Sequence, residues 1–171
     1  MTRVFALGTT LVGALLMWAP VDLPTPTLLV WNASASAPIG LYRVDPFAAP
    51  RIGDRVVVDP PAPVASFLAA RGYLPRGVPL IKTVAALPPS QVCRDGLAIS
   101  INGRVLASAR PEDRRGRRLP VWFGCRTLAA GEVFLLTADV PDSLDGRYFG
   151  PTSVTSIRGV AFPIALRRPG S

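Results

Sequence analysis

The chain has 171 residues, a formal net charge of +8 and no histidine. This length suits one domain with a buried hydrophobic core. Its basic side chains are 18 arginines and one lysine, Lys82. Without an imidazole, the chain can form neither a Ser-His-Asp nor a Cys-His catalytic arrangement, nor a histidine-ligated metal site. If the protein is an enzyme, the group that transfers protons during catalysis must be a carboxylate, a thiol, a tyrosine or Lys82.

An uncharged apolar segment, Val4–Val21, follows Arg3 near the N-terminus. Its length is near the ~17–25 residues that a membrane-spanning helix needs, and Trp18 is suited to a membrane interface. The charge of Arg3 ahead of the segment favours an N-terminus that stays inside the cell. We therefore expect a membrane anchor over residues 1–21 and an extracytoplasmic domain over residues 22–171.

A cleaved secretory signal is the alternative to an anchor, because Ala33-Ser-Ala35 has the small residues of a cleavage site. That triplet lies 12 to 14 residues past Val21, where the apolar segment ends, farther than a cleavage site usually does, which favours the anchor. In both cases Cys93 and Cys125 reach an oxidising compartment. A disulfide between them is therefore expected, with two unpaired buried thiols as the alternative.

Short strands dominate the rest of the sequence. The 19 prolines and 15 glycines are spread along the chain, which indicates many turns in a mainly β domain. Asn102-Gly103 is typical of a two-residue hairpin turn. One helix is expected over Pro63–Arg71, closed by Gly72. The expected strands are Gly40–Val44, Arg55–Val58, Leu80–Ala86, Leu97–Ile101, Arg104–Ala107, Glu132–Thr137 and Val154–Ala161.

A run of arginines, Arg114–Arg118, raises the question of nucleic-acid binding. The run stands beside the acidic pair Glu112-Asp113, has no interleaved aromatic residue and belongs to no recognisable binding fold. We therefore expect a solvated loop near anionic lipid headgroups and no nucleic-acid partner. No segment indicates a metal or cofactor site, and the paired Asp-Thr/Ser-Gly turns of an aspartic protease are missing.

A small-residue turn contains the candidate nucleophile. Ser34 and Ser36 precede Pro38 and Gly40, which constrain the backbone after Ser36. A serine nucleophile needs such a predefined geometry. The hydroxyl of Ser34 and the backbone N–H of Ser36 together form a candidate oxyanion hole.

A second segment contains the candidate base. Lys82 lies in the apolar run Val78–Leu87, and burial in such a run would lower the pKa of its amine enough for it to accept a proton. A third segment, Asp142–Pro151, contains a serine, a second acid and an arginine in the pattern Asp-Ser-Leu-Asp-Gly-Arg.

These three segments, in this order after an N-terminal anchor, resemble those of the type I signal peptidases, serine proteases with a Ser/Lys dyad. The turn Ser36–Tyr42 is similar to the Ser-x-Pro-x-Gly-Leu-Tyr pattern of a conjugative-transfer subgroup called TraF. The resemblance covers nearly the whole chain. It implies a mainly β fold with a signal-peptidase-like antiparallel β catalytic domain, an N-terminal transmembrane helix and an inserted lobe over about residues 92–128. It also implies a bacterial inner-membrane protein whose catalytic domain faces the periplasm.

The resemblance implies a role for each matching residue. Ser36 would be the nucleophile and Lys82 the general base, with Ser34 and the backbone N–H of Ser36 as the oxyanion hole. Ser143 would orient the lysine amine, and Asp145 and Arg147 would form a supporting ion pair. The chain departs from the general bacterial pattern in three places: Ala37 stands where a Met is usual, Thr83 where an Arg is frequent, and Pro89-Ser90 where a Gly-Asp pair is frequent. The first departure points to the conjugative subgroup.

The implied substrate is a pilin or another preprotein, and no cofactor is implied. Hydrolysis and cyclisation of the pilin both remain open at this point. Contacts with membrane lipid and with a conjugation or secretion apparatus are further expectations. Two non-enzymatic alternatives are an anchored, non-catalytic component of that apparatus and a soluble periplasmic binding module.

Overall fold

The computed structural model describes residues 29–167, which form a mainly β protein of antiparallel strands, as the sequence predicts. Among these residues no helix is long and apolar enough to cross a membrane, and the expected anchor lies outside them. The elements in chain order are β1 (Leu29–Asn32), β2 (Gly40–Asp45), β3 (Arg55–Val58), α2 (Ala62–Ala70), β4 (Leu80–Ala86), β5 (Gln91–Asp95), β6 (Ala98–Ile101), β7 (Arg104–Ser108), β8 (Gly124–Thr127), β9 (Glu132–Leu135), α3 (Gly146–Phe149), β10 (Thr152–Ser153), the 3₁₀ turn η1 (Val154–Ser156) and β11 (Ile157–Leu166).

The larger sheet has seven strands in the order β1-β2-β11-β3-β4-β9-β10. In β1 and β2, Asn32 pairs with Gly40, so the segment between them forms a closed turn at the end of the sheet. β4 lies between β3 and β9, and Lys82 is the register partner of Val56. The sheet therefore holds the candidate base on an inner strand and the candidate nucleophile on a turn at its edge hairpin.

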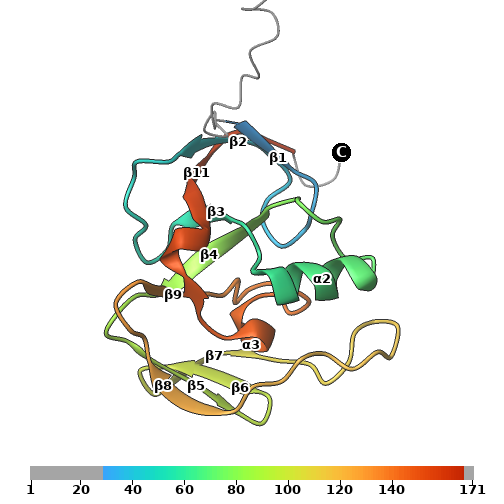
Figure 1. The fold of residues 1–171 in the computed structure, drawn as a ribbon, viewed down its shortest axis with the longest axis vertical. Helices are drawn as coiled ribbons and strands as arrows, with labels where there is room; N and C mark the ends of the chain where they lie inside the picture. The colour runs from blue at the N-terminus through green and yellow to red at the C-terminus, as the bar shows by residue number, and fades with distance from the viewer. Residues whose placement is uncertain (1–28, 168–171) are drawn as a thin grey trace, which may run out of the picture.

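The smaller sheet has four strands in the order β7-β6-β5-β8 and is built from residues 91–127. Figure 1 shows it at the lower end of the molecule, with α2 and α3 between it and the upper strands β1, β2 and β11. Cys93 and Cys125 are direct register partners on β5 and β8, and they are joined by a disulfide. The disulfide predicted from the sequence is thus confirmed.

The two sheets share one hydrophobic core. Ala86 and Phe134 of the seven-stranded sheet pack in one buried cluster with Val92 and Ile99 of the four-stranded sheet. Trp122 packs against this cluster, and its indole N–H donates to the carbonyl oxygen of Gly146 at the start of α3. The smaller sheet is therefore connected by packing and by hydrogen bonding to the segment that follows Ser143.

Seven predicted strands and the helix are present, with ends that differ by a few residues. The hairpin turn is confirmed, because Asn102 and Gly103 both have positive φ. The prediction for Val154–Ala161 is wrong at its start: Val154–Ser156 forms a 3₁₀ turn and β11 continues to Leu166. Pro163 is tolerated in β11 because β3 pairs only with its first residues, so Pro163 needs no second strand partner.

Replacing Gly40 with alanine should destabilise the hairpin that holds the serine turn. Gly40 has φ of +151°, and a Cβ there would lie 2.1 Å from the carbonyl oxygen of Ala165 in β11. We expect Gly40→Ala to lower the unfolding free energy by roughly 3 kcal/mol or more, from the clash and the strained backbone together. The matched control is Gly53→Ala, which has positive φ but no atom within 4 Å and should cost about 1 kcal/mol. Equal urea-unfolding midpoints for the two variants would contradict the close packing of Gly40 against the backbone of Ala165.

Candidate active site

A cleft of about 730 Å³ brings together residues that are far apart in the sequence. Its lining comes from the β1–β2 turn, the start of β4 and the loop before α3. Four of the site residues predicted from the sequence line it: Ser34, Ser36, Lys82 and Ser143. Asp145 and Arg147 are buried behind it.

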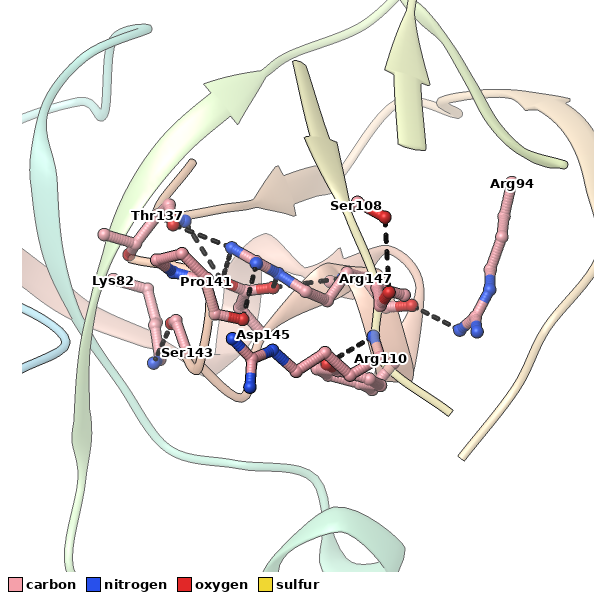
Figure 2. Close-up of polar contacts among 12 residues, drawn as sticks. Lys82, Arg94, Ser108, Arg110, Thr137, Pro141, Ser143, Asp145 and Arg147 are labelled. Carbon is pink, nitrogen blue, oxygen red and sulfur yellow. Dashed lines mark hydrogen bonds and ion pairs between the residues drawn. The ribbon is translucent and has the colours of Figure 1, made fainter. Parts of the chain in front are cut away.

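Lys82 is a buried amine at this cleft. Its neighbour Ile81 is also buried, and since side chains alternate along a strand, the two point to opposite faces of the sheet. The Lys82 Nζ donates to the Ser143 Oγ at 2.9 Å, and Figure 2 shows the two side chains meeting at one side of the polar cluster. Burial lowers the pKa of Lys82 to about 8; the nearby carboxylate of Asp145 opposes this shift, and Arg147 adds to it.

The two serines of the β1–β2 turn contact each other. The Oγ atoms of Ser34 and Ser36 are 3.0 Å apart, and the Ser34 hydroxyl also donates to Asn32 Oδ1 at 3.1 Å. A hydroxyl has one proton, so while Ser34 donates to Asn32 it can only accept from Ser36. To act as an oxyanion donor, the Ser34 hydroxyl must rotate away from Asn32. Ser36 is half-buried and Ser34 is exposed.

Asn32 organises this turn, a role that sequence reasoning missed. Its side-chain amide donates to the carbonyl oxygens of Ser34 at 2.9 Å, Ala37 at 3.0 Å and Pro38 at 3.1 Å. Its Oδ1 accepts from the backbone N–H of Ser34 as well. The signal in the sequence was an Asn directly before a turn of small residues, where its side chain can bond to the following backbone.

Ser36 and Lys82 line the same cleft without a direct bond. No hydrogen bond joins them among residues 29–167, where Lys82 is held by Ser143 and Ser36 by Ser34. Hydrogen bonds between a catalytic base and its nucleophile are often long before substrate binds, so the lack of a direct bond here does not exclude proton transfer between the two.

Asp145 and Arg147 form a fully buried ion pair. The Arg147 Nε donates to Asp145 Oδ1 at 2.8 Å, and the two side chains are 1% and 0% exposed. The Arg147 guanidinium also donates to the carbonyl oxygens of Thr137 at 2.7 Å and Pro141 at 3.1 Å. Asp145 accepts from the backbone N–H of Thr137 at 3.1 Å. The pair therefore fixes both ends of the loop that presents Ser143.

A second buried arginine, Arg94 of β5, was not predicted. It donates to the carbonyl oxygens of Arg147 and, at 3.3 Å, Pro120, and its Nε donates to Gly96 at 3.1 Å. Figure 2 shows Arg94 reaching the polar cluster from the side opposite Lys82. It connects the four-stranded sheet to the turn that contains Asp145 and Arg147.

No metal-binding group is formed among the described residues, since no three His, Cys, Asp or Glu side chains gather there. Besides the serine hydroxyls and the lysine amine, the cleft is lined by the side-chain amide of Asn32, the guanidinium of Arg114 and the carboxylates of Asp139 and Asp142. The hydroxyls, the amine and the backbone amides are the groups suited to acyl transfer. They can activate a serine and stabilise a developing negative charge on a carbonyl oxygen.

A buried lysine that meets one serine in a cleft lined by another is the arrangement expected of a Ser/Lys peptidase. The family model described as signal peptidase, peptidase S26, matches residues 1–165, and the chain belongs to this family. Its curated relatives are proteins of conjugation, which confirms the resemblance stated from the sequence motifs. The conjugal transfer protein TraF of Agrobacterium tumefaciens is 34% identical over 148 residues, which cover 81% of this chain and 82% of that protein.

Two further relatives are also transfer proteins named TraF. The conjugal transfer protein TraF of Agrobacterium fabrum is 35% identical over 143 residues, covering 78% of this chain and 80% of the relative. A plasmid transfer protein TraF of Escherichia coli is 30% identical over 148 residues, covering 81% and 76%. Among solved structures, a signal peptidase I from Enterococcus faecalis aligns with a TM-score of 0.39 and 20% identity over 66% of this chain and 97% of that one.

Proposed function

We propose that the protein is a membrane-anchored serine endopeptidase with a Ser/Lys dyad that processes a pilin precursor during conjugative transfer. The observation that carries the proposal is the buried Lys82 amine, bonded to Ser143 in the cleft that Ser36 also lines. Membership of the signal peptidase family supports the peptidase activity, and the TraF relatives support the role in conjugation. The anchor in the inner membrane and the periplasmic orientation belong to this proposal.

The mechanism follows from the chemistry of the groups. Neutral Lys82 accepts the proton of the Ser36 hydroxyl as the Ser36 oxygen attacks the scissile carbonyl. The backbone N–H of Ser36 and the Ser34 hydroxyl donate to the resulting oxyanion. The lysine ammonium then gives its proton to the departing amine of the scissile bond. The amine departs, and the remaining acyl group is bonded to Ser36 as an acyl-enzyme. Water, or the amino terminus of the pilin itself, attacks the acyl-enzyme and releases a linear or a cyclic product.

The rate of cleavage should rise with pH through the pKa of Lys82. Burial lowers that pKa to about 8, and only the neutral amine can accept the Ser36 proton. We therefore expect kcat/KM to increase about tenfold per pH unit below pH 8 and to level off above it. A purified full-length protein and a fluorogenic peptide suffice for the measurement. A rate that stays flat from about pH 6 to pH 9 would exclude a lysine base with this pKa.

The substrate is tested by co-expressing the chain with the pilin precursor of the same transfer system. Mass spectrometry of the membranes should reveal a shortened pilin with the wild-type protein and only the precursor with Ser36→Ala. A product that lacks the mass of one further water would be cyclic. Full processing by Ser36→Ala would contradict the proposal.

A non-catalytic component of the conjugation apparatus is the second candidate. The conjugal transfer relatives favour it equally, because their names state the process and no reaction. Mating efficiency separates the two candidates: a structural component should tolerate Ser36→Ala, whereas a peptidase should lose transfer.

A further inference from the structure

An arginine-lined pocket of about 310 Å³ lies beside the active-site cleft. Five arginines line it, against three carboxylates, so its lining has an excess of positive charge. The five are Arg71, Arg110, Arg114, Arg115 and Arg117. This pocket gives the Arg114–Arg118 run, which the peptidase chemistry does not use, a definite place in the fold.

The pocket and the cleft adjoin each other. Four residues line both of them: Tyr73, Arg114, Asp142 and Leu144. Asp142 directly precedes Ser143, whose hydroxyl accepts from Lys82. A polypeptide lying in the cleft can therefore extend a side chain or its end into the arginine-lined pocket.

The ion pairs within the pocket do not neutralise all of its arginines. One carboxylate, that of Asp142, pairs with two arginines: it forms an ion pair with Arg110 at 3.0 Å and accepts a hydrogen bond from the Nε of Arg114 at 2.9 Å. The hydrogen bond from Arg114 holds the pKa of Asp142 below its usual value, so this carboxylate is ionised. Arg115 is exposed, and its side chain has no hydrogen bond or ion pair within residues 29–167.

We propose that Arg110, Arg114 and Arg115 form a subsite that binds a carboxylate of the substrate, from an Asp or Glu side chain or from a free C-terminus. The inference rests on the proposed peptidase function and adds a charge preference to it. Guanidinium groups suit this ligand because their planar donors match the two oxygens of a carboxylate. The concave shape and the position beside the cleft favour a peptide over the lipid headgroups expected from the sequence.

Binding of labelled peptides tests the subsite independently of cleavage. The full-length Ser36→Ala protein, in neutral detergent, is titrated against fluorescein-labelled alanine-rich ten-residue peptides, and anisotropy gives Kd. One peptide series has Glu or Gln at successive positions, and a second pair has a C-terminal acid or amide. In at least one pair, the carboxylate member should bind roughly three- to tenfold more tightly. High salt should reduce this ratio, because the ion pairs are exposed. Equal Kd values in every pair would overturn the proposal.

Substitutions at Arg115 test whether this arginine contributes to the preference for a carboxylate. Arg115→Ala should lower the Glu/Gln affinity ratio, Arg115→Lys should largely retain it, and Arg115→Glu should favour a Lys-containing peptide over the Glu peptide. The last result is a gain of specificity that misfolding cannot produce. The matched control is Arg118→Ala, an exposed arginine of the same run that does not line the pocket. A ratio that is unchanged in Arg115→Ala would overturn the subsite.

Two further measurements separate this inference from its alternatives. Binding to phosphatidylglycerol vesicles is compared for wild type and Arg115→Ala; weaker vesicle binding with an unchanged peptide ratio would assign the arginines to the membrane. Cleavage of a neutral peptide by the wild-type protein tests the peptidase function alone. Failure of that cleavage with a retained Glu/Gln ratio would leave the subsite in place and remove the proposed function.

Discussion

Lys82→Met is expected to lower kcat/KM by about 10²–10⁴-fold, the usual contribution of a general base. Methionine fills a similar volume, but it cannot accept the Ser36 proton. Lys82→Arg should be as inactive, because a guanidinium keeps its proton at any working pH. If only a positive charge were needed at this position, Lys82→Arg would remain active. The two variants together therefore distinguish a proton acceptor from an electrostatic role.

The two serines of the turn provide the companion measurement. Ser36→Ala should abolish cleavage, whereas Ser34→Ala should reduce kcat by about 10²–10³-fold with little change in KM, as for loss of one oxyanion donor. The two residues are neighbours in the same turn, joined at 3.0 Å, so each controls for the folding of the other. Equal activities of the two variants would contradict the separate roles.

Arg147→Met should be the most destabilising single substitution at the site. It leaves the carboxylate of Asp145 buried without its partner, since the Asp145 side chain is 0% exposed and its remaining donors are the backbone N–H groups of Thr137 and residue 147. Loss of one partner from a buried ion pair costs about 3–5 kcal/mol. Urea unfolding of the detergent-solubilised protein measures the change. Activity should fall as well, because the Thr137 and Pro141 carbonyls that fix the Ser143 loop lose their donor.

Arg126→Met is the matched control for this prediction. The pair Arg126–Glu132 is also an arginine–carboxylate pair, in which one guanidinium nitrogen lies 2.6 Å and 2.8 Å from the two carboxylate oxygens, but its side chains are 50% and 25% exposed. An exposed pair contributes at most about 1 kcal/mol. Similar losses in the two variants would contradict the importance of burial.

Local patterns predicted the strands and the candidate residues because they depend on near neighbours. Lys82 stood out as the only lysine within an apolar run, and its burial between β3 and β9 follows from that run. The hairpin at Asn102-Gly103 was equally local. The contact between Lys82 and Ser143, which are 61 residues apart, could be predicted only from the family resemblance.

What the sequence did not reveal depends on distant contacts. Nothing in the sequence near Arg94 indicates that it is buried, yet its guanidinium donates to the carbonyl oxygens of two distant residues, Pro120 and Arg147, and its Nε to that of nearby Gly96. The arginine-lined pocket likewise forms only when the 110–118 segment folds against Tyr73 and Asp142. β5 and β8 were missed, although the pairing of their cysteines was predicted: β5 has an arginine at one of its two buried positions, and β8 is short and exposed throughout.

The most direct test of the Ser/Lys mechanism is to identify the group that the substrate acylates. The wild-type protein is mixed with a cleavable peptide, quenched in acid and digested, and mass spectrometry locates the acyl adduct. The adduct should lie on Ser36, be absent from Ser36→Ala, which should not turn over the peptide, and be strongly reduced in Lys82→Met. An adduct on another residue, or undiminished turnover by Ser36→Ala, would contradict the mechanism.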